Sequence, residues 1–282
     1  MQRKISEVKA LKQESNLPEI CVLIPYFQNL PGLLKSLASI VYDPEKLSLL
    51  LVDDGSEKPL TLADLAALQL PYKINILRLA QNQGITKALN SGLTWIREKS
   101  KARYIARLDC GDTCTEERFK AQAKFLEKNP QVALVGSWCL FKSSDSRFSY
   151  TYTTPTNHAE IVKELHWRNV FIHPTVMFRQ EILAETGFYP EAFPAVEDYA
   201  FFMIIASRFQ TAILPQFLVT CEINPKGISI QNRRKQLQGR AAVVKAFGNN
   251  SILKAAGLLK ISLLQLVPYS LILQLKQWQS KR

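Results

Sequence analysis

The chain is poor in cysteine and in long apolar runs, and it has no acidic residue between positions 223 and 282. Its five cysteines are odd in number and match neither a disulfide framework nor a zinc pattern, so we expect reduced thiols in a cytoplasmic protein. The longest uncharged apolar run, Ile261–Leu275, is interrupted by Pro268 and is shorter than the roughly 20 residues of a spanning helix. The first sixteen residues are polar, so we expect no signal peptide.

The positive charge of the chain is concentrated at one end. Of the 36 lysines and arginines, eleven lie in 223–282, which leaves 25 basic against 24 acidic residues in the remainder. A basic segment of this kind favours an anionic partner such as a membrane surface or a nucleic acid. The body is close to neutral and carries no nucleic-acid-binding motif, so we expect no nucleic acid partner.

Short apolar runs alternate with helical patterns through the first 130 residues, which predicts an α/β fold with a mostly parallel central sheet flanked by helices. The runs lie at Glu19–Pro25, Leu47–Val52, Lys73–Leu79 and Tyr104–Leu108. The helical patterns lie at Leu30–Val41, Ile85–Glu98 and Glu116–Asn129. Further along, Val132–Phe141 and Phe148–Thr153 are typical of strands, and His158–Trp167 and Glu197–Ser207 of helices.

Carboxylates follow two of the predicted strands. Asp53 and Asp54 come after the second run, and Asp109 and Asp112 come after the fourth. Because ligands of such sheets bind beyond the carboxyl ends of the strands, these side chains could accept hydrogen bonds from a base and a ribose, or hold a divalent cation. Aspartate also commonly caps turns and helices, but acidic pairs at two strand ends favour a site.

Three other positions are open to two interpretations. Glu197 and Asp198 begin a predicted helix, where acids favour the helix dipole, or they include a general base that takes a proton from an acceptor hydroxyl. His173 precedes a proline in an apolar stretch and is either structural or functional. Arg107, inside a predicted strand, either forms a salt bridge or reaches a phosphate.

An ordered set of motifs resembles the family 2 glycosyltransferases of GT-A (Rossmann-like) fold, and is most similar to bacterial members that build exopolysaccharide, capsule or O-antigen. The resemblance covers about Glu19 to Asn232. The motifs are Val22-Leu23-Ile24-Pro25-Tyr26, Val52-Asp53-Asp54-Gly55-Ser56, Asn82-Gln83-Gly84, Ala88–Leu93, Tyr104–Asp109, Phe125-Leu126-Glu127, Val135-Gly136-Ser137, His173–Arg179 and Glu197-Asp198-Tyr199.

The resemblance implies a role for each candidate residue. Asp198 would be the catalytic base, and His173 and Glu197 would lie on the acceptor side or behind it. The nucleotide-sugar donor would be bound by residues from the first half of the chain. Pro25 and Tyr26 would line the nucleobase pocket, Asp54 with Asp53 would bind the base, Asp109 would hold the ribose, and Asn82, Gly84 and Arg107 would complete the donor wall.

The resemblance also implies Mg²⁺ or Mn²⁺ at Asp109 and Asp112, but the loop departs from the family pattern. The third position of the usual Asp-x-Asp sequence is Gly111, while Asp109 and Asp112 remain, so either Asp112 coordinates the cation alone or the cation is bound weakly. We expect an inverting transferase that moves a sugar, UDP-linked, to a hydroxyl of a saccharide or lipid-linked saccharide acceptor for cell-surface polysaccharide. The alternative is a catalytically impaired nucleotide-sugar-binding or scaffold protein. The Gln-x-x-Arg-Trp motif of processive members is absent.

The predicted organisation is an N-terminal extension (1–18), a catalytic domain (19–232) and a basic helical C-terminal extension (233–282). Within the domain, 19–130 would bind the nucleotide and 131–232 would form the acceptor half. The C-terminal extension combines apolar residues with lysines, so it either lies on an anionic membrane or packs on the domain. The first alternative would make the protein peripheral at the inner face of the cell membrane.

Overall fold

The computed structural model describes residues 19–143, 148–223 and 233–267. The predicted N-terminal extension and the last part of the C-terminal extension lie outside these residues. The predicted strands and helices of the first half are confirmed, with ends that differ by a few residues. They are β1 (Ile20–Tyr26), α2 (Leu30–Ala38), β2 (Leu47–Asp53), β3 (Lys73–Arg78), α3 (Ile85–Lys99), β4 (Tyr104–Arg107) and α4 (Arg118–Lys128). The 3₁₀ helix η1 (Leu62–Leu68), between β2 and β3, is not predicted by the sequence.

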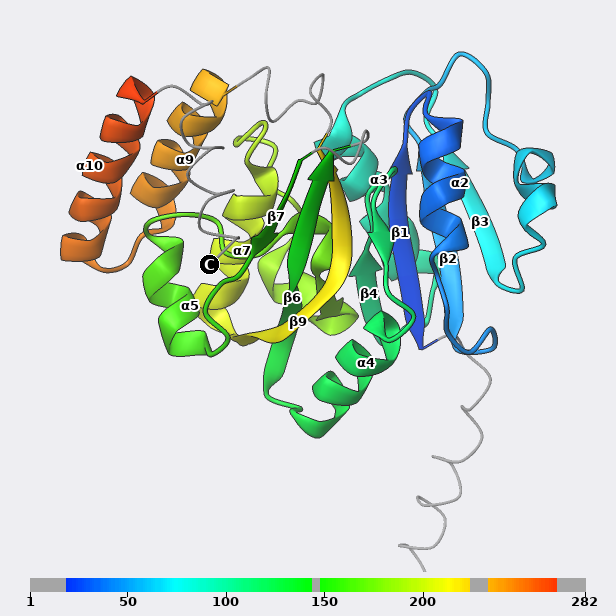
Figure 1. The fold of residues 1–282 in the computed structure, drawn as a ribbon, viewed down its shortest axis with the longest axis horizontal. Coiled ribbons are helices and arrows are strands. Elements are labelled where there is room, and N and C mark those ends of the chain that lie inside the picture. The colour runs from blue at the N-terminus through cyan, green and yellow to red at the C-terminus, as the bar shows by residue number, and fades with distance from the viewer. Residues whose placement is uncertain (1–18, 144–147, 224–232, 268–282) are drawn as a thin grey trace, which may run out of the picture.

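These four strands form a parallel sheet in the order β3-β2-β1-β4 (Figure 1). Every residue of β1 and β2 is buried, which explains why their sequences are nearly continuous apolar runs. Alternate residues of each strand belong to two separate cores, one on each face of the sheet. The helices α2, α4 and η1 cover one face, and α3 covers the other.

The second half adds mostly antiparallel pairings, so that the whole sheet is mixed. Strand β8 (Met177–Arg179) joins β4 to β6 (Val132–Ser143), and the hairpin strand β7 (Ser149–Tyr152) pairs with β6. Strands β6 and β7 are predicted by the sequence. The sequence does not predict β8, the two-residue β5 (Thr113–Cys114) or the long β9 (Gln210–Ile223), which pairs in parallel with β6.

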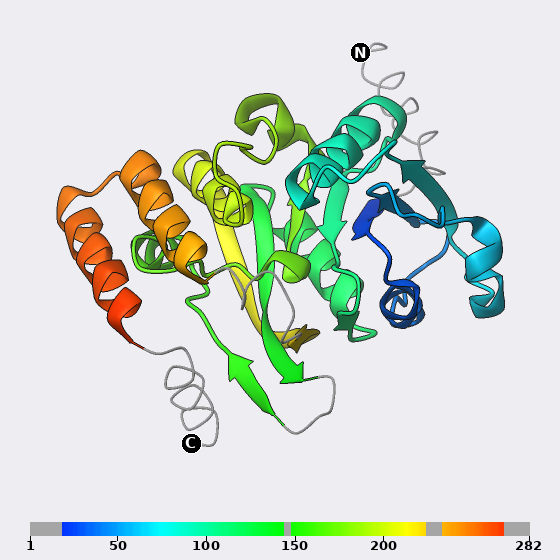
Figure 2. The same cartoon turned by 90° about the horizontal axis from the view of Figure 1, so that it is seen from above.

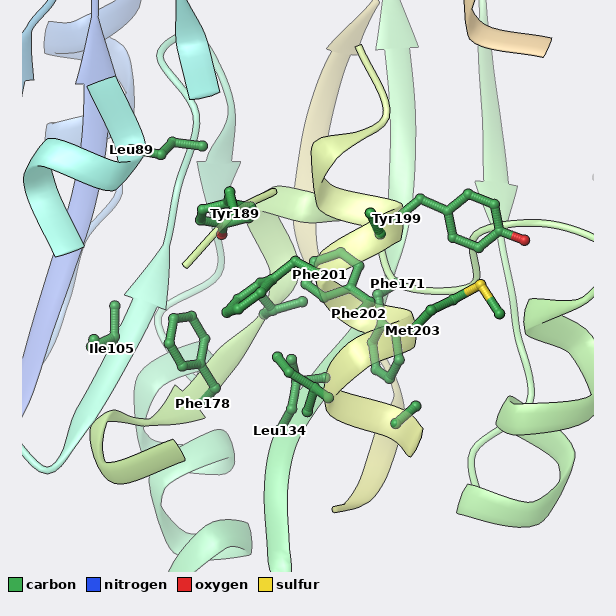
Figure 3. Packing of buried hydrophobic residues seen from close by; sticks show 14 of the residues in the cluster. Leu89, Ile105, Leu134, Phe171, Phe178, Tyr189, Tyr199, Phe201, Phe202 and Met203 are labelled. Atoms are coloured by element: carbon green, nitrogen blue, oxygen red, sulfur yellow. The ribbon is translucent and has the colours of Figure 1, made fainter. Parts of the chain in front are cut away.

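Helix α7 (Glu197–Arg208) fills the space behind this second half with aromatic side chains. Its Phe201 and Phe202 are fully buried, and Figure 3 shows them between Phe178 of β8 and Phe171. The ring centroids of Phe171 and Phe202 are 5.2 Å apart, and those of Phe178 and Phe201 are 5.8 Å apart. This packing fixes the start of α7, where Glu197 and Asp198 lie, against the sheet.

The helices of the predicted C-terminal extension, α9 (Arg233–Phe247) and α10 (Ser251–Leu266), lie side by side at the end of the molecule remote from β3 (Figures 1 and 2). Helix α9 packs against α7, and its Leu237, Val243 and Val244 are buried in the same core as Phe201 and Phe202. Helix α9 therefore packs on the domain, which is one of the two alternatives expected for the extension. No helix in the described ranges is long and apolar enough to cross a bilayer.

We expect Leu237→Ala to lower the free energy of unfolding by about 2–4 kcal/mol, because it leaves a cavity in the core. Leu259→Ala on α10 is the matched control, since Leu259 is 63% exposed and its loss should change stability by less than about 0.5 kcal/mol. Urea denaturation followed by circular dichroism measures both. Equal midpoints for Leu237→Ala and the wild type would show that α9 is not part of the folded domain.

Candidate active site

The carboxyl ends of β1 and β2 lie side by side, and the first candidate residues are on them. Pro25 is paired with Val52 and Tyr26 with Asp53 in the register of the two strands. All four residues are buried. The predicted convergence of strand ends thus places Pro25 and Tyr26 directly beside the Asp53-Asp54 turn.

The carboxylate of Asp53 is committed to the turn that follows β2. It is fully buried, and it accepts hydrogen bonds from the backbone N–H groups of Ser56 at 2.9 Å and Leu60 at 3.0 Å. The guanidinium of Arg78 lies 3.8 Å away. These contacts indicate that Asp53 shapes the turn.

Asp54 connects three segments. Its own N–H donates to the carbonyl of Tyr26 at 2.9 Å, and its carboxylate accepts from the N–H groups of Gln83 at 2.8 Å and Gly84 at 2.9 Å. Gly84 has a φ of 87°, which favours glycine, and it begins helix α3. Asn82, the residue before Gln83, is exposed. Asp54 therefore holds the loop that presents Asn82 and Gly84 next to β1.

Arg107, at the end of β4, is the centre of a second group. Its side chain is fully buried and donates to the carbonyl of Leu23, to Oδ1 of Asp109 at 2.5 Å and to Nε2 of His173 at 3.3 Å. Asp109 is one-third exposed at 34% of its side-chain surface. Of the two interpretations of Arg107, the structure supports the salt bridge, and that bridge orients Asp109.

His173 is held in the neutral form. Burial, and secondarily the positive charge of Arg107, lower the pKa of His173 to about 3. A neutral ring can accept the hydrogen bond from Arg107, and its Nε2 also lies 2.8 Å from the hydroxyl of Tyr189. The backbone of Tyr189 is in turn fixed by two hydrogen bonds to the side chain of Asn90 on α3. His173 therefore acts as a rigid acceptor behind Arg107.

The loop after Asp109 is shaped by Gly111 and Asp112. Gly111 has a φ of 106°, and its N–H donates to the hydroxyl of Ser36 on α2 at 2.9 Å. Asp112 is turned toward β9, where its carboxylate accepts from the N–H of Glu222 at 2.8 Å. Burial, and secondarily the charge of Asp109, raise the pKa of Asp112 to about 8. Within 19–143, 148–223 and 233–267, no three His, Cys, Asp or Glu side chains form a metal-binding cluster.

Asp198, in the first turn of α7, is anchored by a residue that the sequence did not single out. The side-chain N–H of Asn169 donates to Oδ2 of Asp198 at 2.9 Å. Asn169 is itself held, because its carbonyl accepts from the hydroxyl of Tyr152 at 3.1 Å and its side-chain oxygen from the N–H of Phe171 at 3.2 Å. No sequence pattern marks Asn169, which lies in the irregular segment between α5 (His158–Leu165) and β8.

The electrostatic environment of Asp198 is that of a carboxylate that titrates near neutral pH. Burial, and secondarily the neighbouring Glu197, raise the pKa of Asp198 to about 7, and the charge of Asp109 contributes to the rise. Glu197 is only 6% exposed, and its Oε2 has no hydrogen-bond partner. Asp109, which pairs with Arg107, is thus among the charges that act on Asp198.

Comparison with known protein families matches residues 21–187 to Glycosyl transferase family 2. The chain belongs to this family. The amylovoran biosynthesis glycosyltransferase AmsE of Erwinia amylovora is 27% identical to this family 2 glycosyltransferase over 241 residues, which are 85% of this chain and 86% of AmsE. The family membership expected from the motifs is thus confirmed.

Two solved structures have the same fold. TarS 1–349 of S. aureus in complex with UDP-GlcNAc has a TM-score of 0.62 and 17% identity, over 85% of this chain and 69% of that one. The mannosyltransferase PcManGT of Pyrobaculum calidifontis, in complex with GDP-Man and Mn²⁺, has a TM-score of 0.62 and 15% identity, over 92% and 79%. The expected GT-A fold is confirmed by these likenesses.

The buried salt bridge gives a prediction for Asp109. We expect Asp109→Ala to lower the free energy of unfolding by about 2 kcal/mol, because it leaves the Arg107 charge buried without its carboxylate; the partial exposure of Asp109 keeps the loss below that of a fully buried pair. The double variant Asp109→Ala/Arg107→Met should lose less stability than the sum of the two single variants, since the unpaired charge is removed. Urea denaturation of the single and double variants measures these losses. A double variant whose loss equals the sum of the two single losses would show that Asp109 and Arg107 do not stabilise each other.

Proposed function

We propose that this glycosyltransferase is an inverting enzyme that moves a sugar from a UDP-sugar to a hydroxyl of a saccharide or lipid-linked saccharide acceptor, in cell-surface polysaccharide synthesis. The observation that carries the proposal is Asp198, a carboxylate whose pKa is raised to about 7 and which Asn169 fixes within electrostatic range of Asp109. A base with a pKa near the working pH is suited to proton abstraction. The likeness to AmsE supports a polysaccharide product.

The donor would lie across the ends of β1, β2 and β4. In the proposal, Pro25 and Tyr26 line the nucleobase pocket, Asp54 contacts the base, and Asn82 and Gly84 form the wall of the loop that Asp54 holds. Asp53 supports this pocket through the turn after β2. The TarS complex with UDP-GlcNAc supports a uridine donor for this fold.

A divalent cation, Mg²⁺ or Mn²⁺, would offset the charge of the diphosphate when bound. The partly exposed carboxylate of Asp109 is an oxygen ligand of the hard type that these ions prefer. Asp112 is a weaker second ligand in this conformation, because its carboxyl is engaged by Glu222 and its pKa is raised to about 8. In the proposal, Asp109 therefore contributes more than Asp112 to binding of the cation. The structural neighbour PcManGT, in complex with GDP-Man and Mn²⁺, supports the use of a divalent cation.

In the proposed reaction, Asp198 is the general base. Its ionised carboxylate takes the proton of an acceptor hydroxyl, and the hydroxyl oxygen bonds to the anomeric carbon on the face opposite the nucleotide. The bond from that carbon to the diphosphate oxygen breaks, UDP leaves with the electron pair, and the configuration inverts. The transition state is oxocarbenium-like, as in glycoside hydrolysis. Because the base must be ionised, activity should rise with pH through the pKa of about 7.

We expect Asp198→Asn to reduce turnover at least about a hundredfold, since general-base catalysis contributes 10²–10⁴-fold, while UDP affinity stays within about twofold. A UDP-release assay and calorimetry measure the two quantities. Glu160→Gln is the matched control, because Glu160 is an exposed acid in the first turn of α5. Near wild-type turnover in Asp198→Asn would reduce Asp198 to a helix-start residue. UDP-sugar binding without transfer by the wild type would favour the impaired binding protein.

The second part of the proposal places the enzyme at the inner face of the cell membrane through α10. Four large apolar residues of α10 are exposed: Ile252 at 80%, Leu259 at 63%, Leu263 at 56% and Leu266 at 81%. Their spacing of seven, four and three residues puts them on one side of a helix, opposite the buried Ile261. The surrounding segment carries basic but no acidic residues, so an anionic lipid surface is the occupant of matching chemistry.

For the membrane, we expect Leu259→Glu/Leu263→Glu to weaken binding to phosphatidylglycerol vesicles at least about tenfold, because each leucine loses apolar burial. Binding of the wild type should also fall as salt rises. Leu62→Glu is the control, since Leu62 on η1 is 59% exposed but lies away from α10. Vesicle co-sedimentation provides the measurement. Equal binding by all three proteins would show that α10 does not contact lipid.

A further inference from the structure

A groove runs along helix α3, between the end of β3 and the loop that follows α6 (Leu183–Thr186). Its volume is about 730 Å³, inside the range of roughly 300–1,000 Å³ that is typical of small-molecule sites. Residues of α3 at intervals of four, four and three positions border it and so lie on one side of the helix. They are Lys87, Ser91, Trp95 and Glu98. No residue that lines the groove belongs to the proposed donor or base set.

Apolar side chains of the main core come to the surface in this groove. Leu79 after β3, Trp95 on α3 and Phe188 from the loop after α6 are only partly buried at the edge of that core. The guanidinium of Arg97 lies over the ring of Phe188, 4.9 Å from its centroid, and restrains the ring. Among the residues that the structure describes, the indole N–H of Trp95 has no acceptor, so a ligand can accept from it.

The charged side chains of the groove nearly cancel. Lys87 contributes one positive charge, and Glu98 and Glu191 contribute two negative ones, a net of −1. Such a lining does not attract a phosphate or a carboxylate, which disfavours a nucleotide or an anionic lipid as the ligand. Ser91 and Thr94 add hydroxyls, which both donate and accept hydrogen bonds. The lining therefore suits a neutral ligand that is rich in hydroxyl groups.

The walls of the groove are fixed before any ligand binds. The side chain of Asn90 on α3 donates to the carbonyl of Tyr189 at 2.9 Å and accepts from its N–H at 3.0 Å. The ring of Tyr189 is buried against Phe201, with centroids 4.5 Å apart (Figure 3). Phe188, the residue before Tyr189, is therefore held relative to α3, so that binding requires little ordering of the protein.

One end of the groove lies at the loop that the proposed donor would contact. Gln83 borders the groove, and its backbone N–H donates to the carboxylate of Asp54 at 2.8 Å. Asn82 and Gly84, the residues on either side of Gln83, form the proposed donor wall. A molecule that fills the groove therefore extends to the donor loop.

We propose that the groove is a carbohydrate subsite, which holds neutral sugar units of the acceptor that lie away from the reacting hydroxyl. A pyranose has a face of C–H groups that packs on aromatic and aliphatic side chains, and a rim of hydroxyls that pairs with polar ones. The groove offers both kinds of surface along α3. For the identity of the occupant, the inference rests on the proposed function, since a saccharide acceptor is the hydroxyl-rich molecule that the transferase would use.

Binding is tested on the indole N–H signals of protein that carries ¹⁵N-labelled tryptophan. The probes are three neutral tetrasaccharides: cellotetraose, mannotetraose and galactotetraose. The signal that is lost in Trp95→Phe identifies Trp95, and at least one tetrasaccharide should shift it. The signal of Trp138, whose N–H donates to the carbonyl of Thr154 at 2.9 Å, is the internal control and should stay in place.

Two variants of the groove extend the test. Trp95→Ala should weaken binding of that tetrasaccharide at least about tenfold in calorimetry, as the loss of an aromatic anchor commonly does. Because Trp95 also packs on the core, Ser91→Arg is the second variant, which fills the groove from α3 and should weaken binding to a similar extent. Lys99→Ala is the control, since Lys99 is exposed on α3 outside the groove, and it should bind as tightly as the wild type.

The outcomes separate the subsite from the transferase. If the wild type transfers sugar but no tetrasaccharide moves the Trp95 signal, the subsite is overturned. Binding by both groove variants that is as tight as that of the wild type overturns it as well. If the wild type binds a tetrasaccharide at Trp95 but transfers sugar to no acceptor, the proposed function fails while the carbohydrate subsite stands.

Discussion

The buried guanidinium of Arg107 is the interaction on which the arrangement of the site depends. A charge removed from water is tolerated in a protein only when it is paired and its hydrogen bonds are satisfied, since the penalty is otherwise several kcal/mol. Arg107 meets this requirement with a carbonyl of β1, the carboxylate of Asp109 and the neutral ring of His173. Each partner belongs to a different segment, so one buried cation fixes the central strand, the loop after β4 and the acceptor half relative to one another.

The parallel half of the sheet could be predicted from the sequence because strands buried on both faces are continuous apolar runs. Strand β9 could not, because Pro215 interrupts its pattern. Pro215 and Gln216 have no partners in β6, and the register shifts at this point, between Ser137 and Trp138. A bulge accommodates a proline, which has no N–H to donate, and no local sequence pattern indicates the position of a bulge.

The candidate site, too, could be predicted from the sequence only in part. Its location could be predicted, because the ends of neighbouring parallel strands must meet at one edge. The direction of each carboxylate could not: Asp53 is turned to the backbone of its own turn, and Asp112 to β9. Asn169 comes from a segment with no periodic pattern. The predicted boundary at 232 follows the end of the motif resemblance, which does not report packing, and Val243 and Val244 beyond it are buried.

Gly111 has a consequence for how this enzyme could have diverged from relatives that carry an acid at the third position of the loop. A Cβ at Gly111 would meet no atom within 4 Å, so space does not keep a carboxylate out. The backbone does, because a φ of 106° costs a residue with a side chain about 1 kcal/mol or more. Since that conformation also aims the N–H at Ser36 on α2, a return to the acid requires the helix contact to change as well. An aspartate at this position would therefore be strained in the present backbone, and relieving that strain would move the N–H of residue 111 away from Ser36.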